Sequence, residues 1–183
     1  MTMVYTTQDA FNLFRSREVD LTDDVTKDAR ASRDFLLRQI ESTAKDSKAF
    51  PKLYGGAISF GSFARSTKTQ PLDDIDLLLL LNGHGTAAQQ SQVTTYTYWL
   101  EVADPTASMA AFPDDCGYVN STKVLNAIKA GLSDVRKYKK ADIKKNMEAV
   151  TLSLPSYDWV FDIVPAVPIG NWKGGCLRCL KWT

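Results

Sequence analysis

The sequence predicts an α+β domain in which a mixed β-sheet is flanked by helices. Three observations lead to this expectation. A helical repeat of apolar residues fills the N-terminal segment 9–45, an unbroken run of leucines occupies 77–81, and two strand-like segments follow between 147 and 166. We expect one catalytic domain over residues 1–168, with its sheet in a core at 50–168, and an irregular tail at 169–183.

Two helices are expected ahead of the sheet. Residues 9–19 carry apolar side chains at positions that suit a short amphipathic helix. Thr22 is a suitable N-cap for a longer helix to about Ala44, because two aspartates follow it in the first turn. The buried face of that helix is expected at Val25, Ala29, Ser32, Phe35 or Leu36, and Ile40.

A strand at Ala57–Phe60 is expected to turn at Gly61-Ser62 into a helix. The first N–H groups of a helix lack partners within it, so such a turn can hold an anion such as a triphosphate. Glycine lets the backbone approach the phosphates, and the Ser62 hydroxyl adds a donor. Arg65 and Lys68 could contact the phosphates as well, or Arg65 could pair with a surface acid.

Ile75 and the leucines at 77–81 predict a central strand covered on both faces. Because side chains alternate along a strand, Asp74 and Asp76 point to the same side at its start. Two carboxylates so close repel each other unless a cation lies between them, and a hard divalent cation, Mg²⁺ or Mn²⁺, is the natural partner. Taken alone, the acidic residues could equally form a solvated turn.

The set Gly61-Ser62, Arg65, Thr67 and Asp74-Ile75-Asp76 resembles the signature of the DNA polymerase beta-like nucleotidyltransferase superfamily. In that family the glycine and serine hold the nucleotide's phosphates, and the two aspartates ligate two Mg²⁺ ions. Members of that family also use a third carboxylate, which lies on a later, neighbouring strand. The resemblance therefore implies a polymerase beta-like core.

Asp162 is the candidate for the third carboxylate. It is the one acid within an aromatic and β-branched run, and a buried carboxylate is costly without a metal or a donor. The run Phe161–Ala166 resembles the third motif of the bacterial cyclic-oligonucleotide synthases (CD-NTases), relatives of the animal oligoadenylate and cyclic GMP-AMP synthases. The resemblance covers about residues 30–168 and implies that Asp74, Asp76 and Asp162 hold two Mg²⁺ (or Mn²⁺) ions.

The sequence between these motifs gives weaker indications of secondary structure. We expect a helix at roughly 87–102, in a region where the resembled branch varies, and a second helix capped by Asn120 or Ser121 and ending at Val135. The basic stretch from Arg136 to Lys145 is either a solvated helix end or a patch that meets an acceptor nucleotide. A strand at 147–154 should run antiparallel to the Asp162 strand and bring the third acid beside the first two.

Composition narrows the functional classes. A net charge of +1 argues against a large nucleic-acid footprint, and neither a secretory signal nor a membrane span is evident. Three cysteines make no disulfide framework, so a reducing cytoplasm is expected. The single histidine, His84, has the surroundings of a loop residue. The pair Cys176 and Cys179 lacks the further ligands that a closed zinc site needs.

The resemblance implies transfer of a nucleotide from ATP or GTP to a hydroxyl with release of pyrophosphate, yielding a cyclic di- or trinucleotide signal used in antiviral defence. The resembled branch continues with a helical second domain. Because this sequence stops soon after the Asp162 strand, we expect that domain to be missing or truncated, or its place to be taken by a protein partner. Two alternatives remain open. One is a nucleotidyltransferase that modifies RNA, a protein or a small molecule, and the other is an inactive nucleotide-binding module.

Overall fold

The computed structural model describes residues 6–92 and 98–168 of the 183-residue chain. Its helical elements are α1 (Thr7–Phe14), the π-helical η1 (Arg15–Val19), α2 (Asp23–Asp46), α3 (Gly61–Ala64), the 3₁₀ turns η2 (Ser108–Ala111) and η3 (Arg136–Tyr138), and α4 (Ser121–Asp134). Its strands are β1 (Leu53–Phe60), β2 (Asp74–Leu81), β3 (Thr86–Gln90), β4 (Tyr98–Val102), β5 (Asp142–Asn146), β6 (Ala149–Ser153) and β7 (Val160–Ala166).

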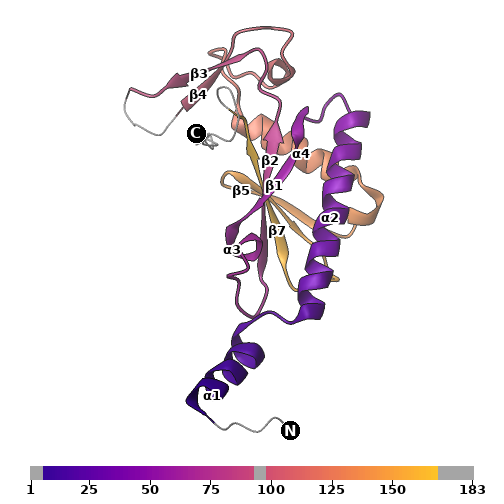
Figure 1. Ribbon diagram of the computed structural model, residues 1–183. Helices are drawn as coiled ribbons and strands as arrows, with labels where there is room; N and C mark the ends of the chain where they lie inside the picture. Colours follow the sequence, from indigo (N-terminus) through magenta and orange to yellow (C-terminus); the bar gives the residue numbers. More distant parts are fainter. Residues whose placement is uncertain (1–5, 93–97, 169–183) are drawn as a thin grey trace.

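Within the described residues, five strands form one mixed sheet in the order β1-β2-β7-β6-β5. Strand β2 runs parallel to β7, and the other neighbouring pairs are antiparallel. Strands β3 and β4 form a separate hairpin that projects from the end of the molecule opposite α1 (Figure 1). The predicted α+β class, with a mixed sheet and flanking helices, is confirmed.

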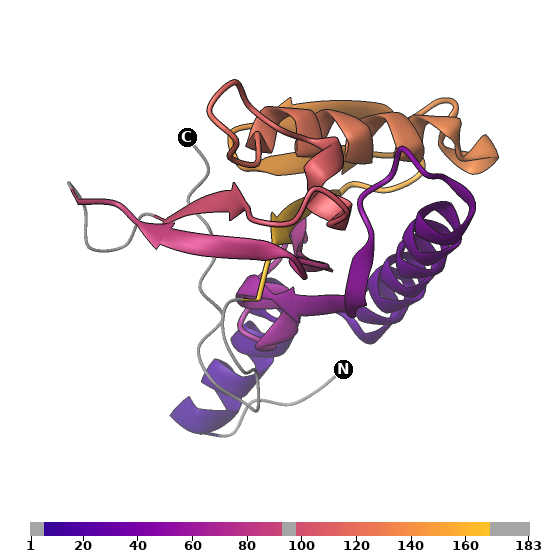
Figure 2. The same ribbon diagram turned by 90° about the horizontal axis from the view of Figure 1, so that it is seen from above.

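Helices α2 and α4 pack on the same face of the sheet and contact each other (Figures 1 and 2). Beneath them, Leu77, Leu79 and Leu81 of β2 are at most 1% exposed. The alternate residues Leu78 and Leu80 belong to a smaller cluster on the opposite face. The prediction of a leucine strand covered on both faces is therefore confirmed, because alternation distributes the five leucines between two apolar clusters.

The long helix begins and packs as its sequence predicts. The Thr22 hydroxyl accepts a hydrogen bond from the Val25 amide at 3.4 Å, which satisfies one donor of the first turn. One face of α2 is buried, at Ala29, Ser32, Leu36, Ile40 and Ala44. Helix α4 is capped in the same way, by the Asn120 side chain, which accepts from the Lys123 amide at 3.0 Å. No helix within the described ranges is long and apolar enough to cross a membrane.

Two local predictions are wrong. The helix expected at roughly 87–102 is instead the β3–β4 hairpin, in which Thr86 pairs with Val102 and Gln89 with Trp99. The basic stretch does not continue helix α4 as a solvated helix end. It forms η3 and then strand β5, which pairs with β6 along the edge of the sheet.

The packing of α4 against Phe50, in the segment between α2 and β1, generates the first testable prediction. A Cβ at Gly131 would lie 2.4 Å from Cδ2 of Phe50, a ring that is 2% exposed. We expect Gly131→Ala to lower the free energy of unfolding by about 1–3 kcal/mol, because the overpacked ring must move. Chemical denaturation measures the change.

Asn126→Ala is the matched control, because Asn126 is exposed on the same helix. Alanine in an exposed helical position is neutral or slightly stabilising. Equal stabilisation by both substitutions would contradict the close packing at Gly131.

Candidate functional site

The three acids singled out in the sequence lie on the face of the sheet opposite α2 and α4. Asp74 and Asp76 alternate with Ile75, which is buried beneath the helices, so their side chains emerge on the other face. Asp162 is the register partner of Asp76 in the parallel β2–β7 pair, and neighbouring strands lie about 4.8 Å apart. The fold therefore brings together three carboxylates that are far apart in the chain.

Gly61 lies directly against Asp76. Its φ of +74° is in the left-handed region, and a Cβ built on it would lie 1.8 Å from Oδ2 of Asp76. Strand β1 causes this approach, because Phe60, the residue before Gly61, pairs with Asp76. Only glycine fits here without displacing the carboxylate.

Ser62 and Arg65 stand at the two ends of the turn that follows Gly61. Ser62 is half-buried in the four-residue helix α3, and its carbonyl oxygen accepts hydrogen bonds from the amide and the hydroxyl of Thr67. Arg65 is exposed at the C-terminal end of α3. The turn thus places Gly61 against Asp76, with Ser62 next along the chain and Arg65 exposed at the end of α3.

Lys68 contacts carboxylates. Its ammonium group forms ion pairs with Asp73 and Asp74, and its side chain is only 15% exposed. Burial acts to lower the pKa of Lys68, but the hydrogen bonds and charges of the two aspartates outweigh it and raise that pKa above its ordinary value. Lys68 was expected to contact the phosphates, whereas its positive charge here neutralises part of the acidic cluster.

The balance of charge around Asp76 remains negative. Burial raises the pKa of Asp76 above its ordinary value of 3.8, and the charges of Asp74 and Asp162 raise it further. Lys68 and Arg65 act in the opposite direction without cancelling these effects. A cation that approaches Asp76 would therefore be attracted by a carboxylate that the protein leaves incompletely compensated.

Asp162 has a hydrogen-bond partner that its sequence pattern did not predict. Its Oδ1 accepts a hydrogen bond from the hydroxyl of Thr151 at 2.7 Å, and Thr151 is its register partner on β6. Lys144 on β5 is in turn the register partner of Thr151 and forms an ion pair with Asp142. A single polar row thus crosses four strands.

The donor set fits a hard divalent cation, because carboxylate oxygens are the ligands such ions prefer. As the side chains stand, however, no three acidic, histidine or cysteine groups among residues 6–92 and 98–168 are close enough to enclose an ion. Asp74 turns to Lys68 and Asp162 to Thr151. The backbone register that aligns Asp76 with Asp162 is the stronger constraint, since side-chain torsions adjust far more readily than strand pairing.

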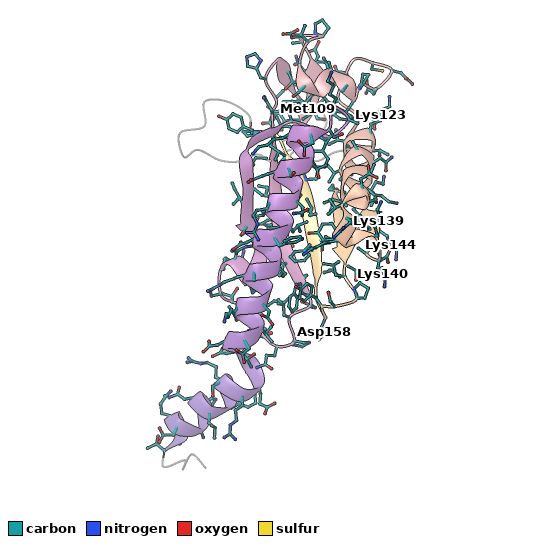
Figure 3. All side chains as sticks on the ribbon, turned by 90° about the vertical axis from the view of Figure 1, so that its right-hand side faces the viewer. Met109, Lys123, Lys139, Lys140, Lys144 and Asp158 are labelled. Atoms are coloured by element: carbon teal, nitrogen blue, oxygen red, sulfur yellow. The ribbon has the colours of Figure 1, made fainter. Side chains whose placement is uncertain are left out.

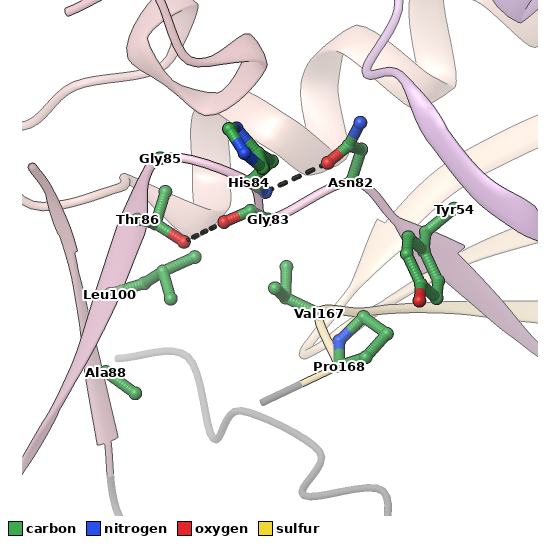
Figure 4. Close-up of a pocket in the computed structure, with 10 residues that line it drawn as sticks. All are labelled: Tyr54, Asn82, Gly83, His84, Gly85, Thr86, Ala88, Leu100, Val167 and Pro168. Carbon is green, nitrogen blue, oxygen red and sulfur yellow. Dashed lines mark hydrogen bonds between the residues drawn. The ribbon is translucent and has the colours of Figure 1, made fainter. Parts of the chain in front are cut away.

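The other singled-out residues lie elsewhere. His84 lines a pocket of about 290 Å³ near the opposite end of β2, where its amide donates to the Asn82 side chain at 2.9 Å (Figure 4). Lys139, Lys140 and Lys144 lie along one side of the molecule (Figure 3). Cys116 is exposed, whereas Cys176 and Cys179 fall outside the described residues.

The chain is similar to known proteins in sequence and in fold. No family model matches it. It is 44% identical over 171 residues to a probable cyclic nucleotide synthase of Bacillus cereus (strain VD146), an alignment that covers 90% of this chain and 49% of the relative. The chain therefore spans about half the length of the curated relative it matches.

Solved structures of low sequence identity share the fold. A complex of E. coli MS115-1 CdnC with a HORMA protein lacking its N-terminus is 18% identical, with a TM-score of 0.54, and covers 87% of this chain and 41% of that chain. The structure of CdnC of the same strain with ATP is 20% identical to this chain, with a TM-score of 0.54. That match covers 87% of this chain and 40% of the CdnC chain. The 44% identity to the probable cyclic nucleotide synthase confirms the resemblance to the CD-NTase-like nucleotidyltransferase superfamily, and the solved structures show that the chain shares the fold of CdnC.

Proposed function

We propose that this chain carries the catalytic site of a nucleotidyltransferase that joins a ribonucleoside triphosphate to a hydroxyl group and releases pyrophosphate. The observation that carries the proposal is the alignment of Asp76 with Asp162 on neighbouring parallel strands, beside Gly61. A product of the cyclic-oligonucleotide class, acting as a signal in antiviral defence, is the corresponding biological proposal. It is supported by the similarity to a probable cyclic nucleotide synthase.

Each site residue has a role in this proposal. Asp74, Asp76 and Asp162 would hold two Mg²⁺ or Mn²⁺ ions, which would supply charge neutralisation and a more acidic acceptor hydroxyl. Gly61 allows the triphosphate to approach the backbone beside Asp76, and the Ser62 hydroxyl donates to it. Lys68 would leave Asp74 as the cations bind and contact the triphosphate, with Arg65 at the rim.

The partners of the site follow by analogy. A CdnC structure contains ATP, which supports a nucleoside triphosphate as the substrate here. Another contains a HORMA protein, which supports a regulatory protein partner. The shared fold extends over 87% of this chain.

The first test is product formation. The purified chain, incubated with four ribonucleoside triphosphates and Mg²⁺ or Mn²⁺, is expected to release pyrophosphate and form a phosphodiester product detectable by mass spectrometry. The double variant Asp74→Ala, Asp76→Ala should lower both signals to the level of the buffer blank, because it removes two metal ligands.

Activity that survives the double change would rule out the proposed carboxylate chemistry. Tight ATP binding by the wild type without any pyrophosphate release would instead support an inactive nucleotide-binding module. Label transferred to an added RNA or protein would identify a different acceptor.

The contact between Gly61 and Asp76 makes a second test possible. Gly61→Ala is expected to abolish pyrophosphate release, because the new methyl group displaces the carboxylate. Gly117→Ala is the matched control. Gly117 also has a positive φ, +88°, but a Cβ there meets nothing within 4 Å.

Both variants should lose about 1–2 kcal/mol of stability from backbone strain, measured by denaturation. Only Gly61→Ala should lose activity. Equal residual activity in the two would show that Gly61 serves the turn and not the carboxylate.

The raised pKa of Asp76 yields a third test, on stability. Because the folded state favours the protonated carboxyl, its contribution is fully present below the ordinary pKa of 3.8 and is lost as the pH rises through the folded value. In metal-free buffer, Asp76→Asn should therefore melt at a higher temperature than the wild type at pH 7. The two melting temperatures should converge toward pH 4.

Added Mn²⁺ with a non-hydrolysable ATP analogue should raise the melting temperature of the wild type more than that of Asp76→Asn. A melting-temperature difference that does not change with pH would contradict the electrostatic explanation.

A further inference from the structure

We propose that Thr151 is a positioning residue for the third carboxylate, and that its hydroxyl fixes the orientation in which Asp162 can bind a metal ion. This inference rests on the proposed function. It assigns a role in the site to a residue on β6, a strand that carries none of the acids. The juxtaposition behind it is a row of three register partners, Asp76, Asp162 and Thr151, on β2, β7 and β6.

The order of the strands places Asp162 between the other two residues. Strand β7 has β2 on one side and β6 on the other, so the Asp162 side chain has Asp76 as one neighbour and Thr151 as the other. The Thr151 hydroxyl donates to Oδ1 of Asp162 at 2.7 Å. With Oδ1 engaged on the β6 side, Oδ2 is left for a ligand shared with Asp76.

The donor is rigid. Thr151 lies in the middle of β6, between the buried residues Val150 and Leu152, which are both 0% exposed. A β-branched side chain in a strand has restricted freedom at χ1, so the hydroxyl has few alternative positions. A hydrogen bond from a hydroxyl to a carboxylate is also stronger than one between neutral groups. Thr151 therefore limits the rotation of the Asp162 carboxylate.

Electrostatics gives the hydrogen bond a further effect. The charges of Asp76 and Asp162 repel each other, because the two residues are register partners one strand spacing apart. Without a donor, Asp162 would lower this repulsion by rotating away from Asp76. The Thr151 hydroxyl stabilises the charged carboxylate in place, much as a group hydrogen-bonded to a metal ligand orients that ligand.

The experiment measures metal binding directly. The wild type and its variants are titrated with Mn²⁺ in the presence of a non-hydrolysable ATP analogue, and free Mn²⁺ is followed by electron paramagnetic resonance. Thr151→Val removes the hydroxyl and keeps the branched shape. We expect it to weaken Mn²⁺ binding about 10- to 100-fold, the usual effect of removing a partner that orients a metal ligand.

Two variants separate positioning from a general loss of structure. Thr151→Ser keeps the hydroxyl and should bind Mn²⁺ within about threefold of the wild type, less than the effect of removing an orienting partner. Ser153→Ala removes a hydroxyl two residues along the same face of β6, where Ser153 pairs with Val160, and should leave Mn²⁺ binding unchanged. If Thr151→Val does not fold, Thr151→Ala replaces it with the same expected result.

Kinetics supplies a second readout. In Thr151→Val the Mn²⁺ concentration for half-maximal pyrophosphate release should rise, while kcat at saturating Mn²⁺ and KM for the nucleotide stay near the wild-type values. A merely structural role would lower kcat without moving the metal requirement.

The outcomes distinguish this inference from the proposed function. Mn²⁺ binding by Thr151→Val equal to that of the wild type would overturn the positioning role and leave the proposed function intact. A wild type that neither binds Mn²⁺ with the analogue nor releases pyrophosphate would refute the proposed function itself. Asp162→Asn is the reference for loss of the third carboxylate. It should weaken Mn²⁺ binding at least as much as Thr151→Val does.

Discussion

The parallel pairing of β2 with β7 is the constraint on which the site depends, because it sets Asp76 and Asp162 opposite each other. Two unit charges about 5 Å apart repel by about 3 kcal/mol at an effective dielectric constant of 20. The two strands stay together because the leucines of β2 are buried on both faces of the sheet, Leu77, Leu79 and Leu81 beneath α2 and α4 and Leu78 and Leu80 on the other face. Each fully buried leucine contributes about 1.5–3 kcal/mol to the free energy of folding. Hydrophobic burial thus outweighs the repulsion between the carboxylates.

The site also depends on contacts that act through the sheet. Gly61 comes within contact of Asp76 because β1 pairs with β2 up to Phe60, and Thr151 reaches Asp162 because β6 pairs with β7. Lys68 arrives from the loop between α3 and β2 and neutralises part of the acidic charge. The backbone N–H of the loop residue Gln70 donates a hydrogen bond to the backbone carbonyl of Val19 at 2.8 Å. The segment that follows Lys68 is therefore tied to the N-terminal helices. The carboxylates, the glycine turn and the lysine are thus connected to one another through strand pairing and ion pairs.

Some segments could not be predicted from local sequence, and each has a physical reason. Residues 86–90 carry alanine and glutamine, which favour helices, yet β3 pairs with β4 and Leu100 is buried to 4% exposure. Glu101 also bridges to Tyr118, seventeen residues along the chain, so partners distant in sequence outweighed the local preference. The basic stretch behaves similarly, because its pairing with β6 turned an expected helix end into an edge strand.

The sequence by itself determined the elements with strong periodicity or capping: the helix after Thr22, the leucine strand, and the alternation that puts Asp74 and Asp76 on one face. It also singled out Asp162, because an acid inside an apolar strand is conspicuous. Only the tertiary structure decided which strand lies beside which. Strand order and register created the Asp76–Asp162 alignment, the contact of Gly61 with Asp76, and the hydrogen bond from Thr151. These contacts join residues far apart in the chain, and local periodicity carries no information about such pairings.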